Sequence, residues 1–482
     1  MGLIPDLAAR RAQLSPEAPA FIDHETGAEW SFARVDAAAA RLGAALLARV
    51  PRGSRVAILC HNRPEFFVAL FACQKAGLIL APLNWRQPVA ELLPVLRSVN
   101  CALVLHDETF AEPAAQLGLP VMPLDIPDVA PLPPVQIDED APWYVLFTSG
   151  TTGTPKAVIQ TPRMVVANAV NIAQAMGLTS EDQTVNFLPL FHTGGINLFT
   201  MPLFLWGGVS LVLRKFDAPA LLDLIAQGRV TQFFGVPAIY QALMAMDLSG
   251  ADLSQLRGWA CGGAALPEAT IRFFAERGAV ICNGFGMTET GPTGFLIDRA
   301  AAIAKIGSVG KPQMMTEARL DGVPDGEAGA GELLLRGPTV TPGYLDNPTA
   351  TEAAFTPDGW LKSGDVAARD ADGYYRIIDR IKDMYISGGE NVYPAEVEKV
   401  LITHPAVLEA AVIGVPDAKW GETGVAFLMA RNGQMPKAET LLPWLRERLA
   451  GYKLPRAFHV VDDFPRTAAG KVRKPELRKL LP

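Results

Sequence analysis

The chain has 482 residues, 49% of them hydrophobic and 19% charged; this is enough for about two to four domains with full cores and excludes general disorder. Its net charge of −7 gives no overall attraction to nucleic acid or to anionic lipid. The five cysteines are odd in number and contain no CxxC pair, and the N-terminus has no apolar signal-like segment, so we expect reduced core thiols in a cytoplasmic protein.

Short β-rich runs alternate with Ala- and Leu-rich helical stretches along the chain. Strands are expected at 56–60, 102–106, 209–213, 232–236 and 280–285. Helical stretches such as 66–76 and 218–226 lie between them, so the sequence predicts an α/β fold with largely parallel sheets. The uncharged run 194–213 is interrupted by Pro202 and a Gly-Gly pair, which favours a buried helix followed by a buried strand over a membrane span.

A Pro- and Asp-rich span, 107–142, is interpreted as a surface connection that leads to the string FTSGTTGTPK at 147–156. Its glycines and hydroxyls can turn backbone N–H groups toward a polyphosphate, and Lys156 adds a positive charge. The spacing differs from the GxxxxGK[ST] pattern of P-loop enzymes, and a polar surface loop without a ligand is the alternative. The candidate phosphate contacts are Thr148, Ser149, Gly150, Thr151, Thr152, Gly153, Thr154 and Lys156.

Two polar motifs follow apolar strands in the middle of the chain. PLFHTGG places His192 before a Gly-Gly turn, where a hydrogen-bonded structural histidine is the alternative to a functional one. NGFGMTE at 283–289 offers the ring of Phe285 for stacking on a base, the Thr288 hydroxyl for a phosphate and the Glu289 carboxylate for a hard divalent cation. A strand-to-helix turn capped by the threonine is the alternative for that motif.

Two further motifs precede a second set of strands and helices. Asp365 in the string SGD could accept two hydrogen bonds from a ribose diol, although Gly-Asp is also a common turn. The segment 379–398 carries Arg380, Lys382 and a Gly-Gly turn that leads into a helix. About a hundred residues follow position 382, and they have strands and helices of their own, so a small second domain is expected there.

The last motif, PRTAAGKVRK, extends Lys471 from a glycine-containing loop, where an isolated lysine would be a solvated charge. Together the motifs resemble the adenylate-forming acyl-CoA synthetases, in that family's order and over nearly the whole chain. The strings KDMYISGGENVYPAEVE and PDAKWGE make the chain most similar to bacterial fatty-acyl and aryl-acid CoA ligases. The resemblance implies a large N-terminal AMP- and acyl-binding domain at 1–381, built of mainly parallel sheets packed with helices, and a small mobile α+β domain at 382–482.

The same resemblance implies two half-reactions and a role for each motif. A carboxylate attacks Mg-ATP to give acyl-AMP and pyrophosphate, and the thiol of CoA then displaces AMP. Such chemistry needs positive charge and N–H donors where negative charge accumulates in the phosphoryl transition state. Three departures from the family pattern are Ala157 in place of glycine, and Phe147 and Phe285 in place of tyrosines.

The resemblance also assigns the individual residues. Catalysis is assigned to Lys471, Thr288, Glu289 and His192, with Mg²⁺ on Glu289 and the domain hinge at Lys382. Beyond the phosphate loop, the implied nucleotide contacts are Gly263, Ala264, Asn283, Gly284, Phe285, Gly286, Met287, Thr288, Asp365, Arg380 and Lys471. CoA is expected beside Gly388, Gly389 and Trp420, and the acyl pocket is expected to be lined by His192, Asn197, Cys261, Gly262 and Gly284.

The strings around this acyl pocket contain no Arg or Lys, so a second substrate carboxylate would be buried unpaired and a monocarboxylic acid is expected. Their glycines leave room for an aromatic ring or for a medium- or long-chain fatty acid, and this choice stays open, as does a homodimer. The expected ligands are the acid, ATP, Mg²⁺ and CoA, without nucleic acid. One alternative is a stand-alone adenylation enzyme that loads a carrier protein; another is a non-catalytic nucleotide-binding relative, which the intact Lys471, Glu289 and Thr288 disfavour.

Overall fold

The computed structural model describes residues 2–148, 155–249, 252–418, 420–431, 433, 437–467 and 470–481. It forms two compact units, Met1–Glu317 with Leu335–Leu361 and Ala318–Leu334 with Lys362–Pro482. The second unit thus takes in residues on both sides of position 382, and the start of the C-terminal domain at 382 stays a prediction. No helix in the described part of the chain is long and apolar enough to cross a membrane.

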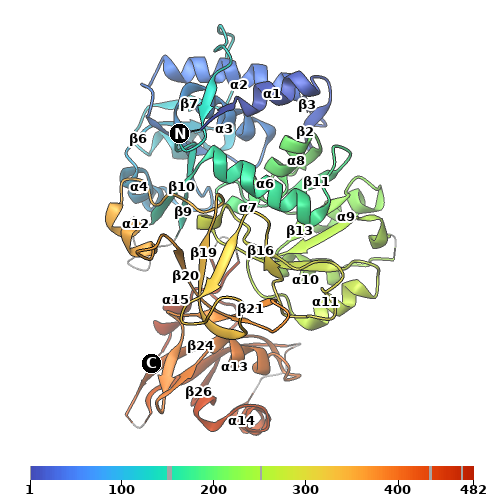
Figure 1. Ribbon diagram of the computed structural model, residues 1–482, viewed down its shortest axis with the longest axis vertical. Coiled ribbons are helices and arrows are strands. Elements are labelled where there is room, and N and C mark those ends of the chain that lie inside the picture. Colours follow the sequence, from blue (N-terminus) through green and yellow to red (C-terminus); the bar gives the residue numbers. More distant parts are fainter. Residues whose placement is uncertain are drawn as a thin grey trace. The chain divides into compact units, whose positions relative to one another are not determined.

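The first unit is built on mixed sheets whose central strands are parallel (Figure 1). One sheet has the order β10 (Lys156–Gln160), β9 (Tyr144–Thr148), β5 (Ile79–Pro82), β4 (Arg55–Leu59), β6 (Cys101–His106) and β7 (Val121–Pro123). A second has the order β11 (Gln183–Asn186), β12 (Val209–Val212), β2 (Pro19–Asp23) and β3 (Glu29–Ser31). A third has the order β13 (Gln232–Gly235), β14 (Gly258–Cys261), β15 (Ile281–Phe285), β16 (Phe295–Leu296) and β17 (Lys311–Pro312).

Helices connect these strands, as βα units require. They are α1 (Leu7–Leu14), α2 (Phe32–Leu47), α3 (Pro64–Ala76), α4 (Val89–Ser98), α5 (Ala111–Ala115), α6 (Pro162–Met176), α7 (Thr193–Asn197), α8 (Thr200–Trp206), α9 (Ala218–Ala226), α10 (Pro237–Met244), α11 (Glu268–Ala275) and α12 (Pro348–Ala354). Short 3₁₀ turns lie at η1 (Glu108–Phe110), η2 (Leu253–Gln255) and η3 (Thr288–Thr290). The uncharged run 194–213 is divided between α7, α8 and β12, so the prediction of a buried helix followed by a buried strand is confirmed.

The helix α6 shows how local sequence sets these elements. Its N-cap Thr161 accepts a hydrogen bond from the Met164 N–H, a proline occupies the first helical position, and Gly177 ends the helix with φ +63°. The apolar face of α6 packs on α8, and the two lie side by side in Figure 1. The helix that follows β10 is therefore held by its caps and by its packing on α8.

Aromatic side chains fill the core of the first unit. Phe21 stacks on Phe67 with ring centroids 4.7 Å apart, and Phe71 lies 4.6 Å from Phe204. Lys75 is buried there but forms ion pairs of 2.6 Å with Asp6 and with a second aspartate on α2, which compensates its charge. All five cysteines, each within the described residues, are buried free thiols, as predicted.

The interpretation of 107–142 as a plain surface connection is incomplete. The span contains η1 and α5, a strand β7 that extends one sheet, and β8 (Gln136–Asp138), which pairs with β1 (Leu3–Pro5). Three-residue strands are too short to give a periodic pattern in sequence. They become visible only through their pairing with distant partners.

The second unit contains two sheets. One has the order β18 (Glu317–Leu320), β19 (Gly329–Arg336), β20 (Leu361–Arg369) and β21 (Tyr375–Arg380). The other has the order β23 (Glu390–Val392), β22 (Tyr385–Ser387), β25 (Gly421–Ala430) and β24 (Val407–Asp417), with β26 (Ala457–Val460) parallel to β25. Its helices are α13 (Pro394–Leu401), α14 (Ala438–Arg446), the 3₁₀ turn η4 (Gly451–Lys453) and α15 (Lys474–Arg478).

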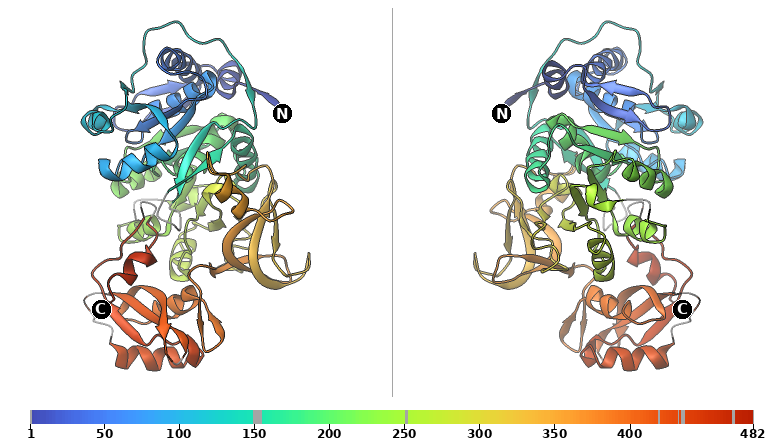
Figure 2. Two further views of the ribbon diagram at one scale, coloured as in Figure 1. Left: turned by 90° about the vertical axis from the view of Figure 1, so that its left-hand side faces the viewer. Right: turned by 90° about the vertical axis from the view of Figure 1, so that its right-hand side faces the viewer.

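Helices cover both faces of the β22–β26 sheet because successive side chains of β24 point to opposite sides. Ala410 and Val412 join a core with residues of α13 and α14, whereas Ala411 and Ile413 pack with Leu477 of α15. Figure 2, which draws this part in orange and red, shows the helices outside the strands. The predicted α/β fold with an α+β C-terminal region is therefore confirmed.

Candidate active site

The strands on either side of the predicted phosphate loop form an antiparallel pair. Thr148, the last residue of β9, lies opposite Lys156, the first residue of β10. The predicted contacts Ser149, Gly150, Thr151, Thr152, Gly153 and Thr154 lie outside the described residues. The described strands nevertheless fix where the chain leaves the sheet and where Lys156 re-enters it.

Tyr344, which sequence analysis did not single out, lies between Lys156 and the predicted metal-binding carboxylate. Its hydroxyl donates to Glu289 Oε1 at 3.0 Å, and the Lys156 Nζ lies 4.8 Å from its ring centroid. Burial, and then the charge of Glu289, raises the pKa of Tyr344, so the phenol keeps its proton and remains a donor. The only signal in the sequence was an aromatic residue in a Pro-Gly turn.

The segment 341–345 joins these groups through the backbone as well. The Thr341 N–H donates to the Glu289 carbonyl at 2.8 Å, and the Thr341 hydroxyl donates to the Ile159 carbonyl at 2.7 Å. From β10, the Gln160 side chain donates to the Thr288 carbonyl at 3.0 Å. Thr288 and Glu289 are thus held against the strand that starts at Lys156.

A single carboxylate at this place fits magnesium. Among the residues that the structure describes, no three His, Cys, Asp or Glu side chains gather as a metal cluster. Mg²⁺ characteristically takes one or two protein carboxylates and completes its octahedron with waters and substrate phosphates. Glu289, which is 6% exposed and oriented by Tyr344, fits that ligand set.

The predicted adenine contacts lie at the end of β15. Asn283 is buried; its Nδ2 lies 3.5 Å from the Ser308 carbonyl, and its Oδ1 has no protein partner among the described residues. Phe285 is half-buried, with its ring edge-to-face to Phe295 at 6.2 Å. Any side chain at Gly286 would collide with the Pro292 carbonyl, so only glycine allows this close approach. The strand end therefore offers one buried acceptor and one ring face.

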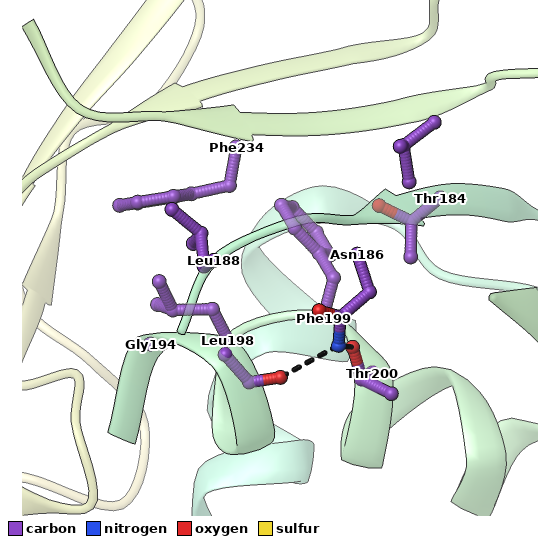
Figure 3. A pocket seen from close by; sticks show the side chains of 10 residues that line it. Thr184, Asn186, Leu188, Gly194, Leu198, Phe199, Thr200 and Phe234 are labelled. Carbon is purple, nitrogen blue, oxygen red and sulfur yellow. Dashed lines mark hydrogen bonds between the residues drawn. The ribbon is translucent and has the colours of Figure 1, made fainter. Parts of the chain in front are cut away.

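His192 is the residue before α7, and two glycines of that helix, Gly194 and Gly195, line a small pocket (Figure 3). Asn186 Nδ2 donates to the Gly195 carbonyl and to the Thr200 hydroxyl, both at 2.7 Å, and so holds α7 and α8 in place. The pocket is lined by Thr184, Val185, Asn186, Leu188, Gly194, Gly195, Leu198, Phe199, Thr200 and Phe234. None of these described residues is charged, which suits an apolar ligand group.

The other residues predicted for the acyl pocket differ in what they contact. Asn197 is fully buried, and its amide is used by Tyr144, which donates at 2.8 Å, and by Thr193, which accepts at 3.2 Å. A Cβ on Gly262 would lie 3.3 Å from the ring of Phe234, so this glycine lies against a ring that lines the pocket. A Cβ on Gly284 would lie 2.7 Å from the Phe295 carbonyl, so a side chain there would press on backbone.

Three other predicted contacts lie at and just beyond the end of β14 and differ in exposure. Cys261 is buried one residue before Gly262, and burial raises the pKa of its thiol, so it remains a neutral packing group. Gly263, with φ +82°, and Ala264 are exposed just beyond the end of β14. They are open to a ligand at that strand end.

In the second unit, the two residues predicted to hold the ribose form an ion pair with each other. Asp365 and Arg380 lie opposite one another on β20 and β21, and Arg380 donates to both carboxylate oxygens at 3.0 and 3.3 Å. Asp365 is 4% exposed. Arg380 therefore orients the carboxylate, whose oxygens are acceptors.

The predicted hinge and CoA-binding residues follow β21 directly. Lys382 is exposed in the turn before β22. Gly388 and Gly389 form the β22–β23 turn with φ of +62° and +85°, and the Gly388 N–H donates to the Trp420 carbonyl at 2.8 Å. A Cβ on Gly388 would lie 2.7 Å from the Trp420 ring, so the glycine lets the indole lie against the turn.

Lys471 is exposed in a hairpin turn near the C-terminus. The Thr467 N–H donates to the Lys471 carbonyl at 2.7 Å, and the Lys471 N–H donates to the Thr467 hydroxyl at 3.1 Å. The predicted residues thus divide between the two units. Lys156, Thr288, Glu289 and the end of β15 lie in the first unit; Asp365, Arg380, Lys382, Gly388, Trp420 and Lys471 lie in the second.

Comparison with known proteins gives matches over almost the whole chain. A family model described as AMP-binding enzyme matches residues 8–345, and the model of the AMP-binding enzyme C-terminal domain matches residues 396–471. A feruloyl-CoA synthase from Amycolatopsis sp is 41% identical over 98% of this chain and 97% of its own length. An indoleacetate–CoA ligase from Aromatoleum aromaticum is 37% identical over 94% and 93%.

The fold is similar to that of solved ligases. The o-succinylbenzoate CoA synthetase from Bacillus subtilis, in complex with its acyl-adenylate intermediate, superposes with a TM-score of 0.89 at 32% identity, covering 99% of each chain. The same synthetase has been solved with ATP and a magnesium ion, with a TM-score of 0.88, 31% identity, 99% of this chain and 100% of that one. The family and the nucleotide chemistry expected from the motifs therefore rest on independent matches.

Proposed function

We propose that this chain takes an aromatic monocarboxylic acid as its substrate. The chain belongs to the AMP-binding enzyme family and is an AMP-forming acid–thiol ligase that uses ATP, Mg²⁺ and CoA. The observation that carries this proposal is the pocket lined by Gly194 and Gly195 of α7, with its uncharged lining and the ring of Phe234 across it. The Phe234 ring offers an apolar face on which an aryl group would pack. A second carboxylate would lose its hydration there without gaining a partner.

Two relatives point to the same class of acid. The feruloyl-CoA synthase and the indoleacetate–CoA ligase are named for acids with an aromatic ring and one carboxylate. Both relatives are also named for CoA as the acceptor, and a carrier protein finds no support among them. We therefore assign free CoA as the acceptor.

The residues of the first unit would bind and orient ATP. Mg²⁺, when held by Glu289, would neutralise charge on the phosphates. The Tyr344 hydroxyl would fix the direction of that carboxylate, and Lys156 would add positive charge at the phosphates. The buried Asn283 Oδ1 is an acceptor for the amino group of adenine, and the half-buried Phe285 ring would stack on the base.

The residues of the second unit would act in sequence. Asp365, oriented by Arg380, would accept hydrogen bonds from the ribose hydroxyls. Lys471 would neutralise charge on the attacking carboxylate and the α-phosphate during adenylation. A rotation about Lys382 would then withdraw Lys471 and present the Gly388–Gly389 turn and Trp420 to CoA, so that the two half-reactions follow one another.

A panel of acids tests the substrate assignment. Acid-dependent pyrophosphate release is measured with ferulate, indoleacetate, hexanoate, palmitate and an aromatic dicarboxylate, each with ATP and Mg²⁺. We expect the highest kcat/KM with an aromatic monocarboxylate, and with CoA alone we expect the thioester as product. A preference for palmitate or for the dicarboxylate would refute the assignment.

A further inference from the structure

The described residues on either side of Lys471, 465–467 and 470–473, pair with each other as the two arms of a hairpin. Arg466 and Val472 form an antiparallel bridge, and the Arg473 N–H donates to the Pro465 carbonyl at 2.7 Å. Phe464, directly before the hairpin, is buried in the apolar cluster that contains Ile413 and Leu477, and Val472 packs against the same cluster. The direction of the hairpin depends on these contacts and on the polar groups that hold its two arms to the rest of the unit.

An ion pair holds the hairpin on each side of Lys471. Before it, Arg466 reaches both carboxylate oxygens of Glu409 on β24, one at 3.0 Å and the other at 2.5 Å. After it, the Lys474 Nζ lies 2.7 Å from Glu398 Oε1 on α13. The Lys474 and Glu398 side chains are only 16% and 21% exposed, so water screens this pair weakly.

The ion pair between Lys474 and Glu398 has further polar contacts with the second unit. Glu398 Oε1 also accepts a hydrogen bond from the Val412 N–H of β24 at 2.8 Å. Burial alone would lower the pKa of Lys474, but the negative charges of Glu398, Asp379 and Asp383 outweigh this effect and raise the pKa. The Lys474 ammonium therefore stays charged at neutral pH. Asp379 in turn accepts from the Ala395 N–H at 2.7 Å, at the start of α13.

From this geometry we infer that Lys474–Glu398 and Arg466–Glu409 position Lys471 for adenylation. The inference rests on the proposed role of Lys471. A lysine side chain has several rotatable bonds, so the precision of its ammonium depends on a fixed backbone. A displacement of about 1 Å costs up to about 10²-fold in rate when a transition-state contact is involved.

This role differs from simple support of the fold, because it concerns one half-reaction only. Lys471 is assigned to adenylation, whereas Gly388, Gly389 and Trp420 of the same unit are assigned to thioester formation. Loss of the ion pairs should therefore weaken adenylation and spare thioester formation from supplied acyl-AMP. A variant that merely misfolds the unit would lose both.

The test measures both half-reactions in Lys474→Met. ATP–pyrophosphate exchange should fall at least tenfold, while conversion of supplied acyl-AMP and CoA to thioester stays within about twofold of the unchanged enzyme. Lys474→Arg, which can still pair with Glu398, should retain most of the exchange. The matched control is Lys479→Met, because Lys479 is an exposed lysine on the same tail that pairs only locally with Glu476.

A double variant guards against an unfolded unit. Lys474→Met alone leaves Glu398 without its partner, which is strongly destabilising for a buried charge. Lys474→Met with Glu398→Leu removes both charges and keeps an apolar contact. If exchange is still reduced at least tenfold and the thioester step is kept, the inference holds; normal exchange, or equal loss of both steps, overturns it.

Lys471→Ala separates this inference from the proposed function. If Lys471→Ala keeps normal exchange, the proposed role of Lys471 is wrong, and the inference falls with it. If Lys471→Ala loses exchange but the Lys474 and Glu398 variants keep it, only the inference is overturned.

Discussion

Removing the hydroxyl of Tyr344 tests how the candidate magnesium carboxylate is held. Tyr344→Phe deletes the donor to Glu289 Oε1 but keeps the ring beneath Lys156. A hydrogen bond to a charged acceptor contributes about 1.5–3 kcal/mol, and loss of a group that orients a metal ligand typically costs about 10- to 100-fold in metal affinity. We therefore expect about a tenfold loss of the affinity that Mg²⁺ adds to nucleotide binding.

Calorimetry with a non-hydrolysable ATP analogue measures this effect without turnover. The dissociation constant is determined once with Mg²⁺ and once with EDTA, and their ratio gives the contribution of the metal. In Tyr344→Phe the ratio should shrink about tenfold, which is about 1.4 kcal/mol, while the affinity in EDTA stays the same. Tyr452→Phe, in η4 of the other unit, is the control and should change neither value.

An equal loss of affinity in both buffers would refute this reasoning, because it would mean that the substitution disturbs the nucleotide site as a whole. An unchanged ratio would show that the Tyr344 hydroxyl does not orient Glu289 for the metal. Thermal unfolding of each variant is followed alongside, since Tyr344 is half-buried and loss of its hydroxyl leaves the Glu289 carboxylate one donor short.

Four further predictions address the remaining assignments. Lys471→Ala should lose ATP–pyrophosphate exchange by about 10²-fold or more and still convert supplied acyl-AMP to thioester; normal exchange would contradict it. Lys382→Pro fixes the backbone φ at about −65° and should spare adenylation while thioester formation falls steeply. Equal loss of both half-reactions would show misfolding or a direct chemical role. Asp365→Asn should raise the KM for ATP about tenfold, because a neutral amide accepts ribose hydrogen bonds more weakly, and an unchanged KM would remove it from the ribose site. Phe234→Ala should widen the pocket and shift the preference in kcat/KM toward bulkier acids. Gly262→Ala presses on the same ring and should shift that preference toward smaller acids; a uniform change across acids would contradict the pocket assignment.

Much of the fold follows from the sequence because its strands are continuous apolar runs. The expected strands at 56–60 and 232–236 lie within one residue of β4 and β13, and the helix at 218–226 is α9. Buried parallel strands give this clear signal since both their faces are covered. The short strands β7 and β8 gave none, because their stability comes from pairing partners far away in sequence.

The sequence predicted the residues proposed to contact the ligands, but not the residues that orient them. Glu289 stands out in the sequence because it follows a buried strand, and Asp365 stands out because it belongs to a Gly-Asp motif before an extended run. Tyr344 does not, because its contacts with Lys156 and Glu289 join three distant segments. The same holds for Lys474 and Glu398: in the sequence each is an ordinary charge on an amphipathic helix, and only the fold shows that they meet.

The acyl pocket shows a different limit. Its glycines are visible in the sequence, but what surrounds each one is set by neighbouring strands. The space beside Gly284 is closed by the Phe295 carbonyl, whereas Gly262 faces the ring of Phe234. Sequence alone could not tell these two environments apart, which is why the choice of acid stayed open.

The most direct test of the account is product analysis with an aromatic monocarboxylic acid such as ferulate. The enzyme is incubated with the acid, ATP and Mg²⁺, first without and then with CoA, and the products are identified by mass spectrometry. We predict acyl-AMP and pyrophosphate without CoA, and with CoA one AMP for each aryl-CoA thioester. Release of ADP and phosphate in place of AMP and pyrophosphate, or no acid-dependent turnover of ATP with any aromatic acid, would contradict the account.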